Sequence, residues 1–193
     1  MKLLVPALAE LDHYAEALRR GGYFPDNIRR EVSAREELAK IDADPASFVA
    51  LLDDRDAKAG PVTLPDGSTV KRLPGYRRWI WDDGDSGGDG GGFCGHIGFR
   101  WQPGASMLPP YVLGHIGYAV VPWKRGRGYA TRALALLLPE ARKEGLAHVD
   151  LTTDPDNIPS QKVIAANGGT LVERFTTTDA HGGGEMLRWR IML

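Results

Sequence analysis

The segment from His115 to Arg132 constrains the fold most, because an apolar stretch with strand character runs through a basic turn into an amphipathic helix. Gly126 and Gly128 allow that turn to be tight and to expose its backbone N–H groups. The helix that follows would add its unpaired N-terminal donors and the positive end of its dipole. A strand, a glycine turn and a helix N-terminus in this order predict an anion site. A solvated turn with surface arginines is the alternative.

Basic side chains surround this turn, and no acidic residue interrupts them. They are Lys124, Arg125, Arg127 and Arg132. The whole chain has 24 Lys and Arg against 25 Asp and Glu, so the positive potential is local. A balanced total charge gives no reason to expect nucleic acid or a membrane surface as a partner. The nucleoside-triphosphate loop and the G-x-G-x-x-G dinucleotide pattern are both missing, which weakens the nucleotide interpretations.

The turn resembles the acyl-CoA-binding motif of the GNAT N-acetyltransferase superfamily, R/Q-x-x-G-x-G/A, which here reads Arg125-Gly-Arg-Gly-Tyr-Ala130. The flanking segments resemble the same family. Residues 117–122 precede the motif like the family's fourth strand, and residues 154–169 follow it like the family's asparagine-to-helix segment. The resemblance implies a GNAT fold, in which helices flank a mixed, mostly antiparallel sheet that is splayed between its fourth and fifth strands.

The periodicity of the chain independently predicts a mixed α/β fold. Apolar residues at helical spacing predict a helix over 7–20, and Ser33 with Glu36 predicts a capping box that starts the next helix. A further helix follows the basic turn, and Pro139 predicts a kink or break in it near Leu138. The last predicted helix spans residues 159–166. Predicted strands cover residues 76–81, 93–101, 114–121, 148–153, 170–176 and 185–192.

Three segments are less regular. Pro45 predicts the start of a short helix over residues 46–52. An Asp-Gly turn within residues 64–68 indicates either an extra hairpin or an irregular arm. Residues 82–92 are rich in glycine and aspartate, and they predict a solvated loop rather than a calcium site, because the EF-hand ligand spacing is missing.

Length and composition predict one domain over residues 1–193. The predicted elements divide it into an N-terminal helical part (1–60) and a sheet core (76–193), and the resemblance implies that this core carries the acyl-CoA site. Cys94 is the only cysteine, which excludes an internal disulfide and suits a reducing compartment. The apolar N-terminus is interrupted by Pro6 and soon followed by Glu10, unlike a signal peptide. We therefore expect a cytoplasmic protein.

The resemblance also implies the contacts to acetyl-CoA. The backbone of Tyr118, Ala119 and Val120 would pair with the pantetheine arm. Asn157 would hydrogen-bond the same arm, and Ser160 would approach the thiol, although helix capping is the alternative for both residues. The pyrophosphate would be bound by the side chains of Arg125 and Arg127 and by the backbone amides of Gly126, Arg127, Gly128, Tyr129, Ala130 and Thr131.

The usual proton-transfer residues of the family are missing. Ile164 stands where many members have a tyrosine that protonates the thiolate, and Thr152 stands at a common position of the acidic base. Strand alternation places His115 on the face opposite Gly114 and Ile116, so a structural histidine is at least as well supported as a catalytic one. His96 and Tyr118 are weaker candidates for a base, and water is another.

The resulting prediction is an N-acetyltransferase in which a primary amine of a small molecule or peptide attacks acetyl-CoA directly, with Asn157 and Ser160 at the reacting group. A covalent intermediate on Cys94 is disfavoured, because no histidine stands at a recognisable partner position. A non-catalytic acyl-CoA-binding or regulatory module is the alternative, and a structural domain with only a phosphate-like site is a third. No metal is expected, a homodimer is left open, and the acceptor is not identified.

Overall fold

The computed structural model describes residues 1–64, 67–84, 91–178 and 183–193. It contains two compact units. The first comprises Met1–Asp54, Tyr76–Gly98 and Tyr118–Ala133, and the second comprises Arg55–Gly75, Phe99–Gly117 and Leu134–Leu193. Helices and antiparallel strands together confirm the predicted mixed α/β class. Within the described ranges, no helix has both the length and the apolar character that a membrane crossing requires.

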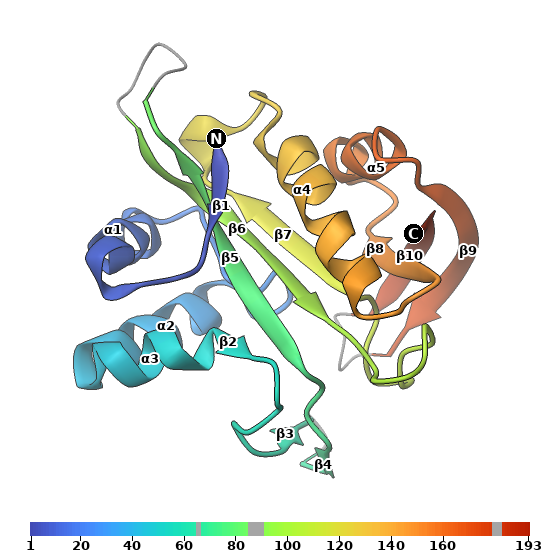
Figure 1. Cartoon of the computed structure of the whole chain (residues 1–193), viewed down its shortest axis with the longest axis horizontal. Helices are drawn as coiled ribbons and strands as arrows, with labels where there is room; N and C mark the ends of the chain where they lie inside the picture. The colour runs from blue at the N-terminus through green and yellow to red at the C-terminus, as the bar shows by residue number, and fades with distance from the viewer. Residues whose placement is uncertain (65–66, 85–90, 179–182) are drawn as a thin grey trace. The chain divides into compact units, whose positions relative to one another are not determined.

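The N-terminal part supplies a short 3₁₀ turn, η1 (Leu8–Glu10), and the helices α1 (Leu11–Arg20), α2 (Arg30–Ala43) and α3 (Pro45–Leu51). The strands β1 (Lys2–Leu4), β5 (Gly75–Asp82), β6 (Gly92–Arg100) and β7 (Ile116–Val120) form one sheet in this order, and β2 (Asp53–Asp54) also pairs with β5. Figure 1 shows β5, β6 and β7 side by side. β7 therefore ends the sheet.

The core of the first unit is built around aromatic rings. Tyr14 of α1 stacks on Trp79 of β5 with ring centroids 5.4 Å apart, and Phe93 of β6 meets Tyr14 edge-on at 5.4 Å. The apolar stripe of α1 faces this core, since Leu11 and Leu18 are buried with Tyr14. The predicted helix is thus confirmed, with its first turn in 3₁₀ form.

The predicted capping box at Ser33 is wrong. α2 already begins at Arg30, and the Ser33 hydroxyl lies inside the helix, where it donates to the Arg30 carbonyl at 2.7 Å. The side chain of Asp26 instead accepts hydrogen bonds from the amides of Ile28 (2.8 Å) and Arg29 (2.7 Å). This local turn, which competes with a cap at Ser33, starts the helix one turn earlier than predicted.

The short helix after Pro45 is confirmed as α3. Asp44 caps it, because its carboxylate accepts a hydrogen bond from the Ser47 amide at 3.0 Å. The arm around residues 64–68 is a hairpin, in which β3 (Val62–Thr63) pairs with β4 (Thr69–Val70). The Asp-Gly turn predicted between these strands lies partly outside the described residues, and so does most of the predicted glycine-rich loop at 82–92.

The second unit contains a three-stranded antiparallel sheet in the order β8 (His148–Thr153), β10 (Gly184–Met192), β9 (Thr170–Thr177). The strands lie beside α5 (Ile158–Ala165) in Figure 1. All three strands and the helix were predicted to within a residue or two. β7 is the last strand of the first sheet, and β8 is an outer strand of the second.

Of the predicted kink or break at Pro139, the break does not occur, because the helix α4 (Tyr129–Lys143) continues through the proline. Its buried face is the predicted one and includes Ala133, Leu134, Leu137 and Ala141. Pro139 removes the hydrogen bond to the Ala135 carbonyl, but both residues are exposed, and water can satisfy that carbonyl. The buried face then holds the helix together across the proline.

Candidate functional site

The basic turn is built from two glycines in the left-handed region. Gly126 has φ 75° and Gly128 has φ 74°, a backbone conformation that other residues adopt only with strain. Residues 125–128 are exposed, and α4 begins directly after them, with the Arg132 amide donating to the Gly128 carbonyl at 3.1 Å. The amides of the first helical turn point toward the turn, since they precede the first helical hydrogen bonds. This geometry suits an anion.

The basic side chains around the turn have different environments. Arg125 is exposed, and its Nε donates to the Val120 carbonyl at 3.1 Å, which ties the turn back to the end of β7. Arg132 lies over the Tyr129 ring at 5.1 Å from the centroid. Lys124, by contrast, is buried, and its Nζ lies 3.6 Å from the Sγ of Cys94. The exposed arginines therefore supply the positive charge that a ligand would meet.

A buried hydrogen bond links the first residue of α4 to the end of β5. The Tyr129 hydroxyl donates to the Asp82 carboxylate at the end of β5. That hydrogen bond lowers the pKa of Asp82, while burial raises the pKa of Tyr129. Burial also raises the pKa of Cys94, which keeps it a thiol at neutral pH. Sequence reasoning missed the pairing of Asp82 with Tyr129, because no motif links residues so far apart in the chain.

The proposed pantetheine-pairing segment lies at the end of the first sheet. Tyr118, Ala119 and Val120 are half-buried residues of β7. On its β6 side the backbone is closely packed, since a Cβ added to Gly95 would lie 2.0 Å from the Ala119 carbonyl oxygen. Within the described residues β7 has β6 as its only strand neighbour in that sheet, so an extended ligand would have one strand edge to pair with.

Asn157 and Ser160 come together in the second unit, at the N-terminus of α5. Asn157 is the N-cap, and its side-chain oxygen accepts a hydrogen bond from the Ser160 amide at 3.1 Å. The capping role that we considered as the alternative is therefore confirmed for Asn157, and Ser160 contributes only its backbone amide to that cap. It uses the carbonyl oxygen of the Asn157 side chain, and the amide nitrogen of that side chain is a separate donor that can serve a ligand.

The residues that replace the family's acid and base have no proton chemistry. Ile164 is fully buried, and a Cβ added to Gly169 would lie 2.3 Å from its Cγ2. A tyrosine would not fit there without rearrangement. Thr152 is a half-buried residue of β8, whose hydroxyl does not titrate near neutral pH. The structure thus places no acid or base at either position.

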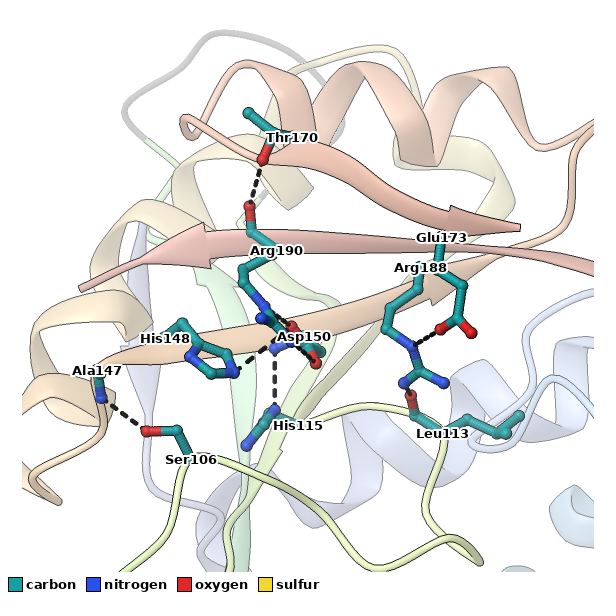
Figure 2. Close-up of polar contacts among 10 residues, drawn as sticks. All are labelled: Ser106, Leu113, His115, Ala147, His148, Asp150, Thr170, Glu173, Arg188 and Arg190. Atoms are coloured by element: carbon teal, nitrogen blue, oxygen red, sulfur yellow. Dashed lines mark hydrogen bonds and ion pairs between the residues drawn. The ribbon is translucent and has the colours of Figure 1, made fainter. Parts of the chain in front are cut away.

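Both candidate histidines form hydrogen bonds to other parts of the protein, which indicates structural roles. His96 lies in the first unit, where its Nδ1 is 2.5 Å from the Tyr23 hydroxyl, and burial lowers its pKa well below the usual value. His115 lies in the second unit, where the Asp150 amide donates to its Nδ1 at 2.9 Å (Figure 2). Burial lowers the pKa of His115 to about 4. Both rings are therefore neutral near pH 7.

Among the described residues, no three His, Cys, Asp or Glu side chains are arranged to hold a metal ion. The aspartates of residues 85–90, which prompted the calcium alternative, lie outside those residues.

Comparison with known proteins assigns this architecture. Residues 30–170 match the family model for the acetyltransferase (GNAT) domain. No curated protein matches the chain in sequence.

Several solved structures share the fold over nearly their whole length. A protein of Bordetella pertussis described as a GNAT-family acetyltransferase is 18% identical with a TM-score of 0.56, over 97% of this chain and 93% of that one. The microcin C7 self-immunity acetyltransferase MccE, bound to acetyl-CoA and AMP, is 13% identical with a TM-score of 0.60, over 99% and 91%. RimL, a ribosomal L7/L12 α-N-protein acetyltransferase bound to CoA, is 13% identical with a TM-score of 0.57, over 99% and 93%. At these identities the likeness concerns the fold.

Proposed function

Because the chain belongs to the GNAT acetyltransferase family and is therefore an acyltransferase, we propose that it transfers an acetyl group from acetyl-CoA to a primary amine of a small molecule or peptide. The observation that carries this proposal is the exposed turn at residues 125–128, with two left-handed glycines at the N-terminus of α4. A polyphosphate is the natural ligand of such a turn. Among proteins of this fold, MccE is bound to acetyl-CoA and RimL to CoA.

In this proposal acetyl-CoA is held mainly by backbone groups. The terminal strand β7 pairs with the pantetheine arm at residues 118–120, and the Asn157 side chain donates to that arm. The guanidinium groups of Arg125 and Arg127 add charge–charge attraction to the pyrophosphate. The pyrophosphate accepts hydrogen bonds from the amides of Gly126, Arg127, Gly128, Tyr129, Ala130 and Thr131.

The proposed reaction is a direct displacement. The neutral amine forms a C–N bond to the thioester carbonyl, a β7 amide polarises the carbonyl oxygen, and the C–S bond breaks to release the CoA thiolate. The proton of the amine passes to solvent. The thiol of CoA has a pKa near that of cysteine, about 8.5. The thiolate therefore leaves readily near neutral pH without a dedicated acid. Positioning of the two reactants then supplies most of the rate.

Ser160 has a minor part in this mechanism, because its amide serves the cap of α5 and its hydroxyl would only assist the leaving thiolate. Replacing Ser160 with alanine should lower kcat by less than about a hundredfold and leave acetyl-CoA affinity unchanged. Steady-state kinetics with calorimetric binding measures both quantities. A loss of more than about a thousandfold would show that the hydroxyl is an essential group.

A second candidate is a non-catalytic acyl-CoA-binding module, which is favoured by the burial of Ile164 at the usual acid position. Release of the CoA thiol, followed with a thiol reagent across a panel of amines and N-terminal peptides, separates the two. The enzyme proposal requires amine-dependent thiol release. Binding of acetyl-CoA without turnover on any acceptor would favour the module, and failure to bind acetyl-CoA would exclude both.

A further inference from the structure

His115 is hydrogen-bonded to a strand of each sheet. Its carbonyl accepts from the Arg100 amide at 2.9 Å, and Arg100 ends β6 of the first sheet. Its own amide donates to the Asp150 carbonyl at 2.7 Å, and Asp150 lies in β8 of the second sheet. The next residue, Ile116, begins β7. His115 thus directly precedes β7 and is hydrogen-bonded both to β6 and to β8.

The His115 side chain completes this junction. In a sheet, the Asp150 amide would donate to a backbone carbonyl of the neighbouring strand. The His115 carbonyl is engaged by Arg100, and the ring Nδ1 accepts from the Asp150 amide instead, at 2.9 Å (Figure 2). The imidazole therefore takes the place of a main-chain acceptor. An amide hydrogen bond of this kind leaves a buried donor unpaired when it is lost.

The surroundings hold both partners in place. The Asp150 carboxylate is clamped by Arg190, with Nε–Oδ1 at 2.7 Å and Nη2–Oδ2 at 2.9 Å. Gly114 presses against the same strand, because an added Cβ would lie 3.1 Å from the Asp150 carbonyl oxygen. The His115 ring is completely buried. The backbone of β8 is thus fixed from the β10 side by Arg190 and from the other side by residues 114–115.

The junction requires a neutral ring. An amide can only donate, so Nδ1 must be unprotonated, and the ring proton is assigned to Nε2 by this contact. In a doubly protonated ring the Nδ1–H group would face the Asp150 amide, which is also a donor, and the hydrogen bond would be lost. The charged and titratable groups facing the ring are His148 and Asp150 of β8 and Arg190 of β10, and burial outweighs the attraction of Asp150 in lowering the pKa of His115 to about 4.

We propose that His115 is a positioning residue, whose ring Nδ1 fixes the start of β7 against β8. This inference rests on the proposed function. The positioning by His115 matters for acetyl transfer because β7 is the strand assigned to the pantetheine arm. Loss of the ring would let the start of β7 shift and would misplace the thioester. A displacement of about 1 Å at a reacting centre can cost roughly a hundredfold in rate.

The test compares His115→Ala with His115→Asn, because the asparagine Oδ1 lies near the position of the histidine Nδ1 and does not titrate. We expect kcat/KM for acetyl-CoA to fall about a hundredfold in His115→Ala and by less than about threefold in His115→Asn. As the pH falls toward 4, kcat/KM of the wild type should fall because the ring becomes protonated, and His115→Asn should lack that decline. His148→Asn is the matched control, since His148 is a neighbouring histidine that does not bind the Asp150 amide.

Hydrogen exchange of the Asp150 amide, measured by NMR, decides the junction independently of activity. The amide should be protected in the wild type, His115→Asn and His148→Asn, and should exchange at least tenfold faster in His115→Ala. Unchanged protection in His115→Ala would overturn the proposal, and so would an asparagine variant as impaired as the alanine one. If the wild type does not bind acetyl-CoA, the proposed function fails, while the exchange data still decide whether His115 fixes the strand.

Discussion

Among single residues, Gly126 and Gly128 determine the shape of the basic turn through their backbone. Both have φ near +75°, where a β-branched residue is strongly strained. Space is not the constraint at Gly128, since an added Cβ would meet only the flexible end of Arg132 at 3.4 Å. The glycine is needed for conformation and for the close approach of a phosphate, which a side chain would block.

Replacing Gly128 with valine should therefore weaken acetyl-CoA binding at least tenfold, at a cost of about 1–2 kcal/mol in stability. Gly145→Val is the matched control. Gly145 follows the other end of α4, has φ 77°, and has open space around its Cβ position, so the strain is similar but remote from the turn. Isothermal titration of both variants measures the effect. Equal affinity in a folded Gly128→Val variant would place the ligand elsewhere.

The buried histidine His115 makes stability depend on pH. Its folded pKa of about 4 lies below the unfolded value of about 6.5, so the unfolded chain binds more protons between these values. The contribution of the neutral His115 ring to the free energy of unfolding is therefore complete above about pH 6.5. It is lost as the pH falls toward 4, by at most about 3 kcal/mol.

Urea unfolding at pH 7, 6 and 5 should show this loss in the wild type and a smaller one in His115→Asn, which has no ring to protonate. The same pH dependence in both proteins would show that other groups, such as the buried His96, dominate the acid response.

For whole elements, the sequence was a good guide wherever local signals agreed. The limits of β8 follow from alternation alone, and α3 follows from Pro45. It failed where two local signals competed. Asp26 and Ser33 are both residue types that often cap helices. In the structure the Asp26 carboxylate accepts from the Arg29 amide before the helix begins, whereas the Ser33 hydroxyl donates to the Arg30 carbonyl inside it. At Pro139 the sequence left a kink or a break open, and the break does not occur because the side chains that α4 buries outweigh the lost hydrogen bond, which local propensity does not reveal.

The N-terminal helices are tied to the sheet by a buried ion pair. Arg77 of β5 has its Nη1 3.1 Å from both carboxylate oxygens of Glu37 in α2, and 3.0 Å from the Tyr14 hydroxyl of α1. Both charged side chains are largely buried. Such a pair adds little net stability, but breaking it leaves a charge without compensation.

Glu37→Ala should therefore destabilise the protein by about 3–5 kcal/mol. The adjacent Glu36 forms an exposed ion pair with Arg29, the N-cap residue of α2, and Glu36→Ala should cost less than about 1 kcal/mol. Thermal and urea unfolding measure both. Similar small losses in the two variants would mean that water reaches Arg77 and that the pair is not buried in solution.

For the whole molecule, the sequence reveals those parts of the candidate site whose residues lie close together in the chain. The turn, its glycines and its arginines lie within a few residues of one another, so the motif is readable. Contacts between distant residues are not, and the Asp82–Tyr129, Lys124–Cys94 and His115–Asp150 pairs emerge only from the fold.

Binding of acetyl-CoA should stabilise the protein by mass action, because the proposed site is assembled only in the folded chain. At a ligand concentration a hundredfold above Kd the gain is about 3 kcal/mol, which for a chain of this size raises Tm by roughly 6–10 °C. Scanning fluorimetry with increasing acetyl-CoA measures the shift, and Gly128→Val should show little of it at the same concentrations. If wild type and variant shift equally, the ligand binds away from the turn. If neither shifts at concentrations that saturate other GNAT proteins, the chain does not use acetyl-CoA, and the proposed function fails with it.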